Sequence, residues 1–339
     1  MAYKGNHCIT GTTILLALSL FLLFTVLFSF SVGRYSIPMT DILGFLFTGK
    51  CTDRNLPLLL TEIRLPRILG AVLVGGALSV SGAAYQGIFR NPMVSPDILG
   101  VSSGAGFGAS LAILFSFGLA GIQGMAFVTG IVSVCIALSV SKIMSKAHDR
   151  ILMLVLSGMI VGSMFSALIS LIKYIADSEY KLPDITFWLM GSLAEVTLKE
   201  LKAVFPFIAL ALIPLLLSSW RLNVLSFGDE EAQALGVHAG RLRIIVIGCA
   251  SLITASAVSI TGLIGWVGLI IPHFARFLVG PNHKVLLPAS FLVGSVFMLV
   301  VDDLSRSVSS LEIPLGIITS LIGAPMFLII LRLSSKHTW

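Results

Sequence analysis

Charged residues are scarce in this sequence, and their scarcity indicates its class. Asp, Glu, Lys and Arg make up 11% of the 339 residues, while 56% are hydrophobic. A soluble domain carries about 25% charged residues, so water cannot be the main solvent of this surface. A helix that crosses the bilayer needs about 20 apolar residues, which leaves room for roughly ten spans with short loops.

The sequence also has few residues that form cross-links or bind metals. Its four cysteines and six histidines are dispersed, and no C-x-x-C pair occurs. This spacing predicts neither a disulfide framework nor a metal site, and we expect no bound cofactor. The formal charge of +6 comes from basic residues in short loops without interleaved aromatic residues, so it does not indicate nucleic-acid binding.

Catalytic motifs are incomplete or missing. Residues Gly44 to Cys51 spell most of a Walker A loop, but Cys51 stands where a Ser or Thr hydroxyl would bind magnesium. Gly104, Gly106 and Gly108 lie within an apolar run rather than in a dinucleotide-binding turn. No G-x-S-x-G motif, H-E-x-x-H motif or pair of catalytic carboxylates occurs. We therefore predict that the chain is not an enzyme and does not itself hydrolyse ATP.

The central parts of the apolar runs are almost free of charged residues. Transporters that use an ion gradient usually place ionisable residues there, although each is costly in the membrane. An ion-coupled secondary transporter is therefore the disfavoured alternative. If the protein moves a solute, we expect the energy to come from a partner protein.

Continuous apolar runs predict an all-α integral membrane protein with about ten transmembrane helices. The first run, 14–31, is long for a signal peptide and no small-residue cleavage site follows it, so we expect it to be retained. A short helix over 184–194 is expected not to cross. Residues 1–339 then form a single polytopic membrane domain, with spans near 14–32, 66–88, 98–118, 121–141, 151–173, 203–219, 244–262, 264–280, 286–304 and 314–333.

The distribution of basic residues favours a cytoplasmic N-terminus. With that end inside, 12 of the 22 Lys and Arg but only five of the 16 Asp and Glu lie on the inner side. Ten crossings return the C-terminus to the same side, so both termini are expected in the cytoplasm.

Small residues recur at every fourth position in two of the predicted spans. Such faces let helix backbones approach closely in lipid, where no hydrophobic force drives helices together. We predict close helix packing for most of these residues, with a minority lining a pathway. The two runs are Gly75, Ser79 and Ala83, and Gly100, Gly104 and Gly108.

Several segments together resemble the FecCD permease family, the transmembrane subunits of type II ABC importers for iron–siderophores, haem and vitamin B12. Each motif is short, but their order is collinear from about residue 60 to residue 330. Two positions depart from the family pattern: Trp266 stands where Phe is usual, and Asp303 adds a second acid beside Asp302. The segments are Arg64-Leu65-Pro66-Arg67, Arg90-Asn91-Pro92-Met93, Leu222-Asn223-Val224-Leu225, Gly228 to Ala232, Gly265 to Leu269, Pro272-His273-Phe274-Ala275-Arg276, Asp302 to Arg306, Glu312 to Gly316 and Gly323 to Phe327.

The resemblance implies a function and a set of partners. The chain would be the permease of an ABC importer in the cytoplasmic (inner) membrane, working by alternating access. Two ATPase subunits would bind inside, one solute-binding protein outside, and a second permease copy, most simply an identical one, would complete the pathway. An iron–siderophore is the first expected substrate because it is the commonest in the family; haem, cobalamin and molybdate stay open.

The loop 220–243 is the longest polar segment predicted on the cytoplasmic side. Three consecutive acids there would favour a helix N-terminus through the helix dipole, and Gly236 permits a sharp turn. In the family this element fits a groove on the ATPase. The resemblance therefore implies an ATPase-coupling role for Gly228, Asp229, Glu230, Glu231, Ala232, Leu235, Gly236 and Val237.

Three arginines, Arg64, Arg67 and Arg306, fall on the predicted outer surface. The resemblance implies that they dock a solute-binding protein by pairing with its glutamates, a task that suits the planar guanidinium. The alternative is that each snorkels from a helix end, and Arg67 is also a candidate for a structural role.

Asn91, Pro92 and Met93 lie where a span meets the cytoplasm. Proline disfavours helical geometry at Asn91, so the helix should end there. The resemblance implies that Asn91 and Met93 help to form the inner gate, with a simple tight turn as the alternative. His273 and Arg276 are expected to bond to neighbouring backbone at the cytoplasmic end rather than to hold a metal or haem.

Overall fold

The computed structural model describes residues 4–48, 55–144, 150–308 and 311–334, and these residues are mostly helical. Seven of their helices are long and apolar enough to cross a membrane, and three shorter apolar helices accompany them. The ten correspond to the ten predicted spans, so the all-α membrane fold is confirmed. They are α1 (Lys4–Ser31), α4 (Leu65–Phe89), α5 (Val101–Leu114), α6 (Leu119–Met144), α7 (Arg150–Ile175), α9 (Leu198–Leu217), α12 (Ala239–Thr261), α13 (Val267–Val279), α14 (His283–Ser307) and α15 (Leu315–Ser334).

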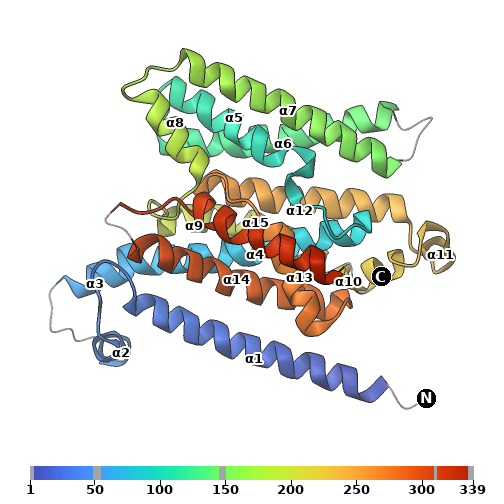
Figure 1. The fold of residues 1–339 in the computed structure, drawn as a ribbon, viewed down its shortest axis with the longest axis horizontal. Helices are drawn as coiled ribbons and strands as arrows, with labels where there is room; N and C mark the ends of the chain where they lie inside the picture. The colour runs from blue at the N-terminus through green and yellow to red at the C-terminus, as the bar shows by residue number, and fades with distance from the viewer. Residues whose placement is uncertain (1–3, 49–54, 145–149, 309–310, 335–339) are drawn as a thin grey trace.

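The remaining elements are short and lie near the ends of the long helices (Figure 1). The short helix predicted over 184–194 is α8 and begins a few residues earlier. Gly44 lies inside helix α2, and Cys51 lies outside the described residues. The short elements are α2 (Met39–Thr48), α3 (Leu56–Leu58), the π-helical turn η1 (Leu59–Arg64), the 3-10 turn η2 (Pro96–Leu99), α8 (Lys181–Met190), α10 (Ser219–Leu225) and α11 (Asp229–Ala234).

Two of the spans are shorter than predicted because left-handed backbone precedes them. Gly100, with φ of +77°, ends η2 and starts α5, which has 14 residues. Trp266, with φ of +71°, precedes the 13-residue α13. Left-handed backbone is unusual for a residue with a side chain, and the Trp266 ring packs edge-on against Phe327 at a centroid distance of 6.3 Å.

Helix α4 is the centre of the bundle. It contacts α14, α12, α13 and α9, and 83% of the apolar stretch that contains it is buried in the protein, against 11% for α1. Helix α1 runs along one edge of the bundle (Figure 1) and leaves one set of its apolar side chains exposed, among them Leu20 and Phe24, as expected for a lipid-facing helix.

Glycines bring α4 close to two of its neighbours. A Cβ added at Gly75 would lie 2.4 Å from the Gly294 oxygen in α14, and one at Gly82 would lie 1.8 Å from the Gly268 oxygen in α13. Gly108 makes a similar approach to Met125 in α6. The predicted packing role of these small residues is confirmed.

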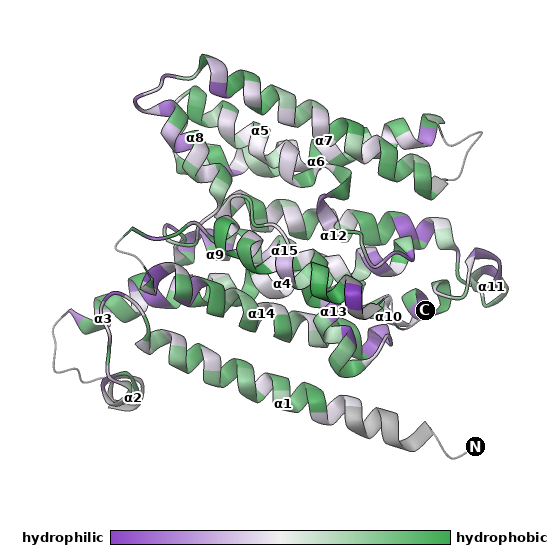
Figure 2. Ribbon diagram, viewed as in Figure 1, coloured by the Kyte–Doolittle hydropathy of each residue, from purple (hydrophilic) through white to green (hydrophobic). Residues whose placement is uncertain are grey.

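Polar residues gather at the two ends of the bundle (Figure 2). Helix α1 begins and α15 ends at the same end as α10 and α11, whereas α3 and α8 lie at the opposite end (Figure 1). An even number of crossings is consistent with this arrangement. We refer to the end with α11 as the inner end and to the other as the outer end.

Candidate functional site

The segment predicted to contact the ATPase, residues 220–243, folds around the short helix α11 at the inner end (Figure 1); we refer to it as the coupling segment. Its two turns fall at glycines with positive φ: Gly228 at +131° before α11, and Gly236 at +79° after it. Side chains are poorly tolerated at these backbone angles. The predicted turn at Gly236 and the predicted start of a helix at Asp229 are both confirmed.

Asp229 ties α11 to two long helices. Both terminal nitrogens of Arg243, in α12, donate to its carboxylate at 2.8 Å. Arg90, the residue after α4, lies 3.8 Å from the same carboxylate. The hydrogen bonds from Arg243 and the charges of both arginines hold the pKa of Asp229 below its ordinary value.

The coupling segment has one face that packs on the bundle and one that faces away. Ala232 and Val237 are buried. Phe227 and Leu235 expose 73% and 58% of their surface, and Glu230 and Glu231 are also exposed. These two exposed apolar side chains, on a segment that is otherwise polar, make this face a candidate for a protein–protein contact.

The residues predicted for the gate form a turn directly after α4. The helix ends at Phe89, and Arg90 adopts left-handed backbone with φ of 49°. The Met93 backbone N–H donates to Asn91 Oδ1 at 2.9 Å. Met93 exposes 45% of its surface, so its side chain is available to a second subunit or to a passing solute.

His273 and Arg276 fasten α13 to the end of α4. His273 Nε2 lies 2.9 Å from the Pro92 carbonyl oxygen, which confirms the predicted backbone contact. The prediction was wrong for Arg276, because its Nη2 donates to the side chain of Gln86 at 3.0 Å. Gln86 in turn donates to the Leu269 carbonyl oxygen at 3.0 Å. The gate turn therefore depends on α13 as well as on α4.

A buried ionic cluster lies at the outer end. Arg67 Nε donates to Asp302 at 2.7 Å, and Arg67 Nη1 lies 2.8 Å from Glu312. Arg306 lies 3.4 Å from Asp302 and also pairs with Asp303. The Asp302 side chain is fully buried and that of Glu312 is 29% exposed, so the cluster extends from the interior to the surface.

The three arginines predicted to dock a partner are brought to this end, but all bond within the chain. Arg64 donates to the backbone oxygens of Phe30 and Tyr35, and Arg306 donates to the Ser29 backbone oxygen at 2.8 Å. Arg64, Arg67 and Arg306 expose only 4–5% of their surface. Their docking role stays a prediction, and any partner carboxylate would have to compete with these internal acceptors.

Sequence reasoning missed several partners in these contacts. Ser29 and Glu312 bind the outer arginines, and Asn223 and His283 bind each other at the inner end. Glu312 carried a signal, because it stands in one of the segments that resemble the family. Ser29 carried none, since it lies in an apolar run and its contact joins residues far apart in the chain.

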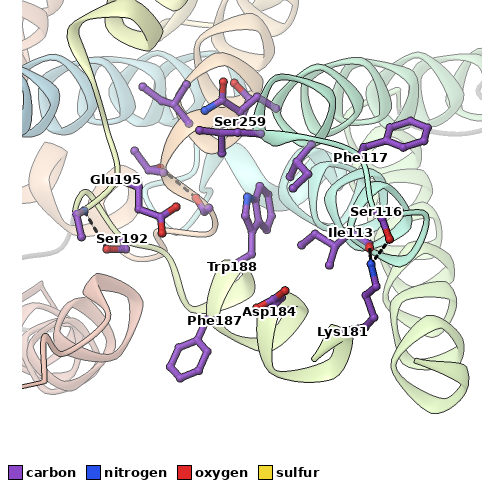
Figure 3. Close-up of a pocket in the computed structure, with 17 residues that line it drawn as sticks. Ile113, Ser116, Phe117, Lys181, Asp184, Phe187, Trp188, Ser192, Glu195 and Ser259 are labelled. Atoms are coloured by element: carbon purple, nitrogen blue, oxygen red, sulfur yellow. Dashed lines mark hydrogen bonds between the residues drawn. The ribbon is translucent and has the colours of Figure 1, made fainter. Parts of the chain in front are cut away.

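A cavity of about 660 Å³ opens at the outer end, between α8, the turn before α6 and the end of α12 (Figure 3). Lys181 in α8 donates to the Ile113 backbone oxygen at 3.0 Å and to the Ser116 hydroxyl. The carboxylates of Asp184 and Glu195 and the Trp188 ring also line the cavity. Cationic, anionic and aromatic groups together do not select a single charge of solute.

The described ranges contain no group of three or more His, Cys, Asp or Glu residues that could hold a metal ion. The polar contacts at the two ends instead join arginines to carboxylate, amide or carbonyl oxygens, and histidines to amide or carbonyl oxygens. Contacts of this kind position helices relative to one another.

Comparisons with known proteins agree with this geometry. A family model described as the FecCD transport family matches residues 21–333. A solved structure described as an inward-facing conformation of a putative metal-chelate type ABC transporter has a TM-score of 0.86 and 44% identity, covering 95% of this chain and 99% of that one.

Curated relatives carry names for chemically different substrates. A molybdate import system permease of Haemophilus influenzae is 47% identical over 93% of this chain and 94% of its own length. A probable iron chelatin transport system permease of Helicobacter pylori is 40% identical over 81% of this chain and 82% of its own. A hemin transport system permease of Yersinia pestis is 37% identical, with 80% and 82% covered.

Proposed function

Because the chain belongs to the FecCD transport family and is a transport subunit of an ABC importer, we propose that it imports a metal-bearing solute, with molybdate as the first candidate. ATP is hydrolysed by a separate ATPase subunit. Membership also implies a substrate-binding protein and a paired permease.

The proposed assembly has two copies of this chain, two ATPase subunits and one binding protein in the cytoplasmic (inner) membrane. The inner end faces the cytoplasm, so both termini lie there with the coupling segment. The observation that supports this orientation is the position of Arg90, Arg241 and Arg243 around α11, which agrees with the excess of basic residues expected on the cytoplasmic side.

The exposed face of the coupling segment is the proposed ATPase contact. Phe227 and Leu235 would enter an apolar groove on the ATPase, while Glu230 and Glu231 would meet basic residues at its rim. Asp229 holds this face to α4 and α12 through Arg90 and Arg243. Movement of the ATPase would thereby reach α4 and the gate turn that follows it, where we place Asn91 and Met93.

The outer cluster is the proposed docking end for the binding protein. Glu312 is the partner of Arg67 that lies nearest the surface, with 29% of its side chain exposed. A carboxylate of the binding protein would replace Glu312 on Arg67, and others would compete for Arg64 and Arg306. Exchange of one carboxylate for another keeps the buried arginines paired, which avoids the cost of an isolated charge.

The substrate proposal rests on one observation. Similarity to the permease named for molybdate is higher and extends over more of the chain than similarity to the permease named for iron chelatin. The iron–siderophore expected from the sequence is the second candidate, supported by the latter relative. The cavity at the outer end favours neither, because its lining mixes charges of both signs.

Uptake by the reconstituted importer tests the proposal directly. The permease, its ATPase and its binding protein would be placed in liposomes and supplied with labelled molybdate or with labelled iron in a siderophore. Uptake of molybdate that requires ATP supports the first candidate, and uptake of the iron chelate alone supports the second. An ATPase that forms no complex with the permease would contradict the coupling proposal.

A further inference from the structure

The Asn223 side chain connects the coupling segment to the first turn of α14 by several hydrogen bonds. Its Nδ2 donates to Asn282 Oδ1 at 2.8 Å. Its Oδ1 accepts from the His283 backbone N–H at 2.8 Å and lies 2.8 Å from His283 Nδ1. One side chain of α10 thus makes three hydrogen bonds to the start of another helix.

These bonds fix the orientation of every group that takes part. An amide oxygen only accepts, so His283 Nδ1 carries the proton that it donates to Asn223. Asn282 Oδ1, which accepts from Asn223, also accepts from the Lys284 backbone N–H at 3.1 Å and caps α14. The cap of α14 is therefore built partly by α10.

The junction has little room to adjust. His283 is 7% exposed, and its Nε2 is buried without a hydrogen-bond partner. A Cβ added at Gly87, in α4, would lie 2.6 Å from that nitrogen. A ring held by Asn223 on one side and packed against the α4 backbone on the other cannot turn without moving α14.

Helix α14 connects this junction with the outer cluster. It has 25 residues and therefore extends about 37 Å at the usual rise per residue. Its last turns carry Asp302, Asp303 and Arg306, which form the outer cluster with Arg67. Figure 1 shows α14 running from the neighbourhood of α10 to that of α3.

Along its length α14 is held to α4 as one unit. A Cβ added at Gly294 would lie 2.0 Å from Ser79 Oγ and 2.4 Å from the Gly75 oxygen. Ser295 Oγ donates to the Val72 carbonyl oxygen at 2.8 Å. Contacts this close leave no space for one helix to slide past the other.

We propose that Asn223 and His283 are positioning residues that make α14 follow the coupling segment, so that α14 carries the conformational signal between the ATPase end and the outer cluster. This inference rests on the proposed importer function. It gives the coupling segment a direct contact with α14, whereas the Asp229 contact with Arg90 reaches α14 only through α4. We call the hydrogen bonds of Asn223 to Asn282 and His283 the α10–α14 joint. Asn223 would move with α10, and His283 would move with α14.

The test uses the complete importer in liposomes and compares variants on the two sides of the joint. Asn223→Ala removes all three bonds, whereas His283→Ala removes only the one made by Nδ1. Ser226→Ala is the matched control, because the Ser226 hydroxyl donates to the Asn223 backbone oxygen at 2.7 Å. His283→Asn keeps a donor near the position of Nδ1, whereas His283→Gln places its donor at the position of Nε2.

We expect Asn223→Ala and His283→Ala to assemble, and the stimulation of each variant is the ratio of its ATPase activity with substrate-loaded binding protein to its activity without it. The stimulation of that activity by substrate-loaded binding protein should fall about fivefold or more, the usual lower limit for coupling between linked sites. Ser226→Ala and His283→Asn should keep the stimulation, and His283→Gln should lose it. The double variant should be no worse than Asn223→Ala, since that substitution already removes all three bonds.

Three outcomes would overturn the inference: unchanged stimulation in Asn223→Ala, losses that add in the double variant, or His283→Asn and His283→Gln behaving alike. Failure of Asn223→Ala to assemble while Ser226→Ala assembles would also overturn it, because the joint would then hold the fold rather than transmit movement. A wild-type complex that shows no stimulation would instead refute the importer proposal, so the two failures can be told apart.

Discussion

Replacing Arg67 by alanine should destabilise the permease strongly, before any effect on docking can be measured. The Arg67 side chain is 7% exposed and its partner Asp302 is fully buried. The substitution would leave the Asp302 carboxylate with only Arg306, whose Nε lies 3.4 Å away and makes no hydrogen bond to it. The buried Asp302 carboxylate would then be stabilised only by the nearby charge of Arg306, without a hydrogen bond from it.

The magnitude follows from the loss of one partner of a buried pair, which costs about 3–5 kcal/mol. The remaining charge of Arg306 offsets part of this, so we expect a value near the lower limit, about 3 kcal/mol. The bond between Arg67 and Glu312 adds little, because Glu312 is partly exposed and surface pairs contribute about 0–1 kcal/mol.

The double variant Arg67→Met, Asp302→Leu separates charge from packing. Removing both partners leaves no isolated charge, and such replacements are often neutral or stabilising. The double variant should therefore be more stable than Arg67→Ala although it carries more substitutions. Arg67→Lys should be intermediate, since an ammonium cannot reach both Asp302 and Glu312 with the fork of a guanidinium.

Thermal unfolding of the detergent-solubilised permease, followed by the loss of its monodisperse chromatographic peak, measures the difference. An Arg67→Ala melting temperature equal to that of the wild type would refute the reasoning, as would a double variant less stable than the single one. Binding-protein affinity should be compared only among variants that keep the wild-type melting temperature. Reversal of these arginines to glutamate is a poor docking test, because it would bury a cluster of like charges.

Four further results are expected. Gly82→Ala should lower the stability of the permease by about 1–3 kcal/mol through overpacking, because the new Cβ would lie 1.8 Å from the Gly268 oxygen. Gly248→Ala in α12, where a Cβ would have no atom within 4 Å, should be neutral or stabilising in the same unfolding assay. Phe227→Ala should leave the melting temperature unchanged and weaken capture of the ATPase in a pull-down; a lower melting temperature would contradict its exposed position. The pKa of Asp229 is lowered from 3.8, so the stability that its carboxylate contributes is complete above pH 3.8 and is lost as the pH falls through the lower folded value. The difference in melting temperature between the wild type and Asp229→Asn should therefore be the same at pH 5 and at pH 8. A difference found only at pH 8 would refute this. Ser81→Ala should cost about 0.6 kcal/mol, the average for such bonds in a membrane, since its hydroxyl bonds to the Ala250 oxygen at 3.1 Å.

The positions of the spans were predictable because bilayer thickness imposes a length on apolar runs. Turns at Gly236 and after Phe89 were also predictable, since glycine and proline restrict the backbone locally. The short α5 and α13 were not, because apolar composition continues through the irregular residues before them. Only the left-handed backbone of Gly100 and Trp266 shows where those helices begin.

The polar contacts were harder to foresee. Arg67 and Asp302 are 235 residues apart in the chain, and nothing in the local sequence pairs them. A sequence also does not show whether an arginine at a span end faces outward or inward, because snorkelling and burial have the same local pattern. The three outer arginines were assigned to the outer surface by the predicted topology and the family resemblance. The structure buries them at the outer end, and their docking role stays a prediction.

The distribution of polar contacts separates rigid parts of the bundle from parts that can rearrange. The buried charged pairs that the structure describes lie at the outer end, where removal of one partner costs several kcal/mol. The inner half of α4 is joined to α12 by neutral bonds, such as that between Tyr85 and Ser251 at 3.0 Å, and bonds of this kind contribute about 0.6 kcal/mol in membranes. A transport cycle that must break and remake contacts at each turnover would therefore rearrange the α4–α12 side of the bundle, while α14, held to α4 by glycine contacts and fastened at both ends, moves without changing shape.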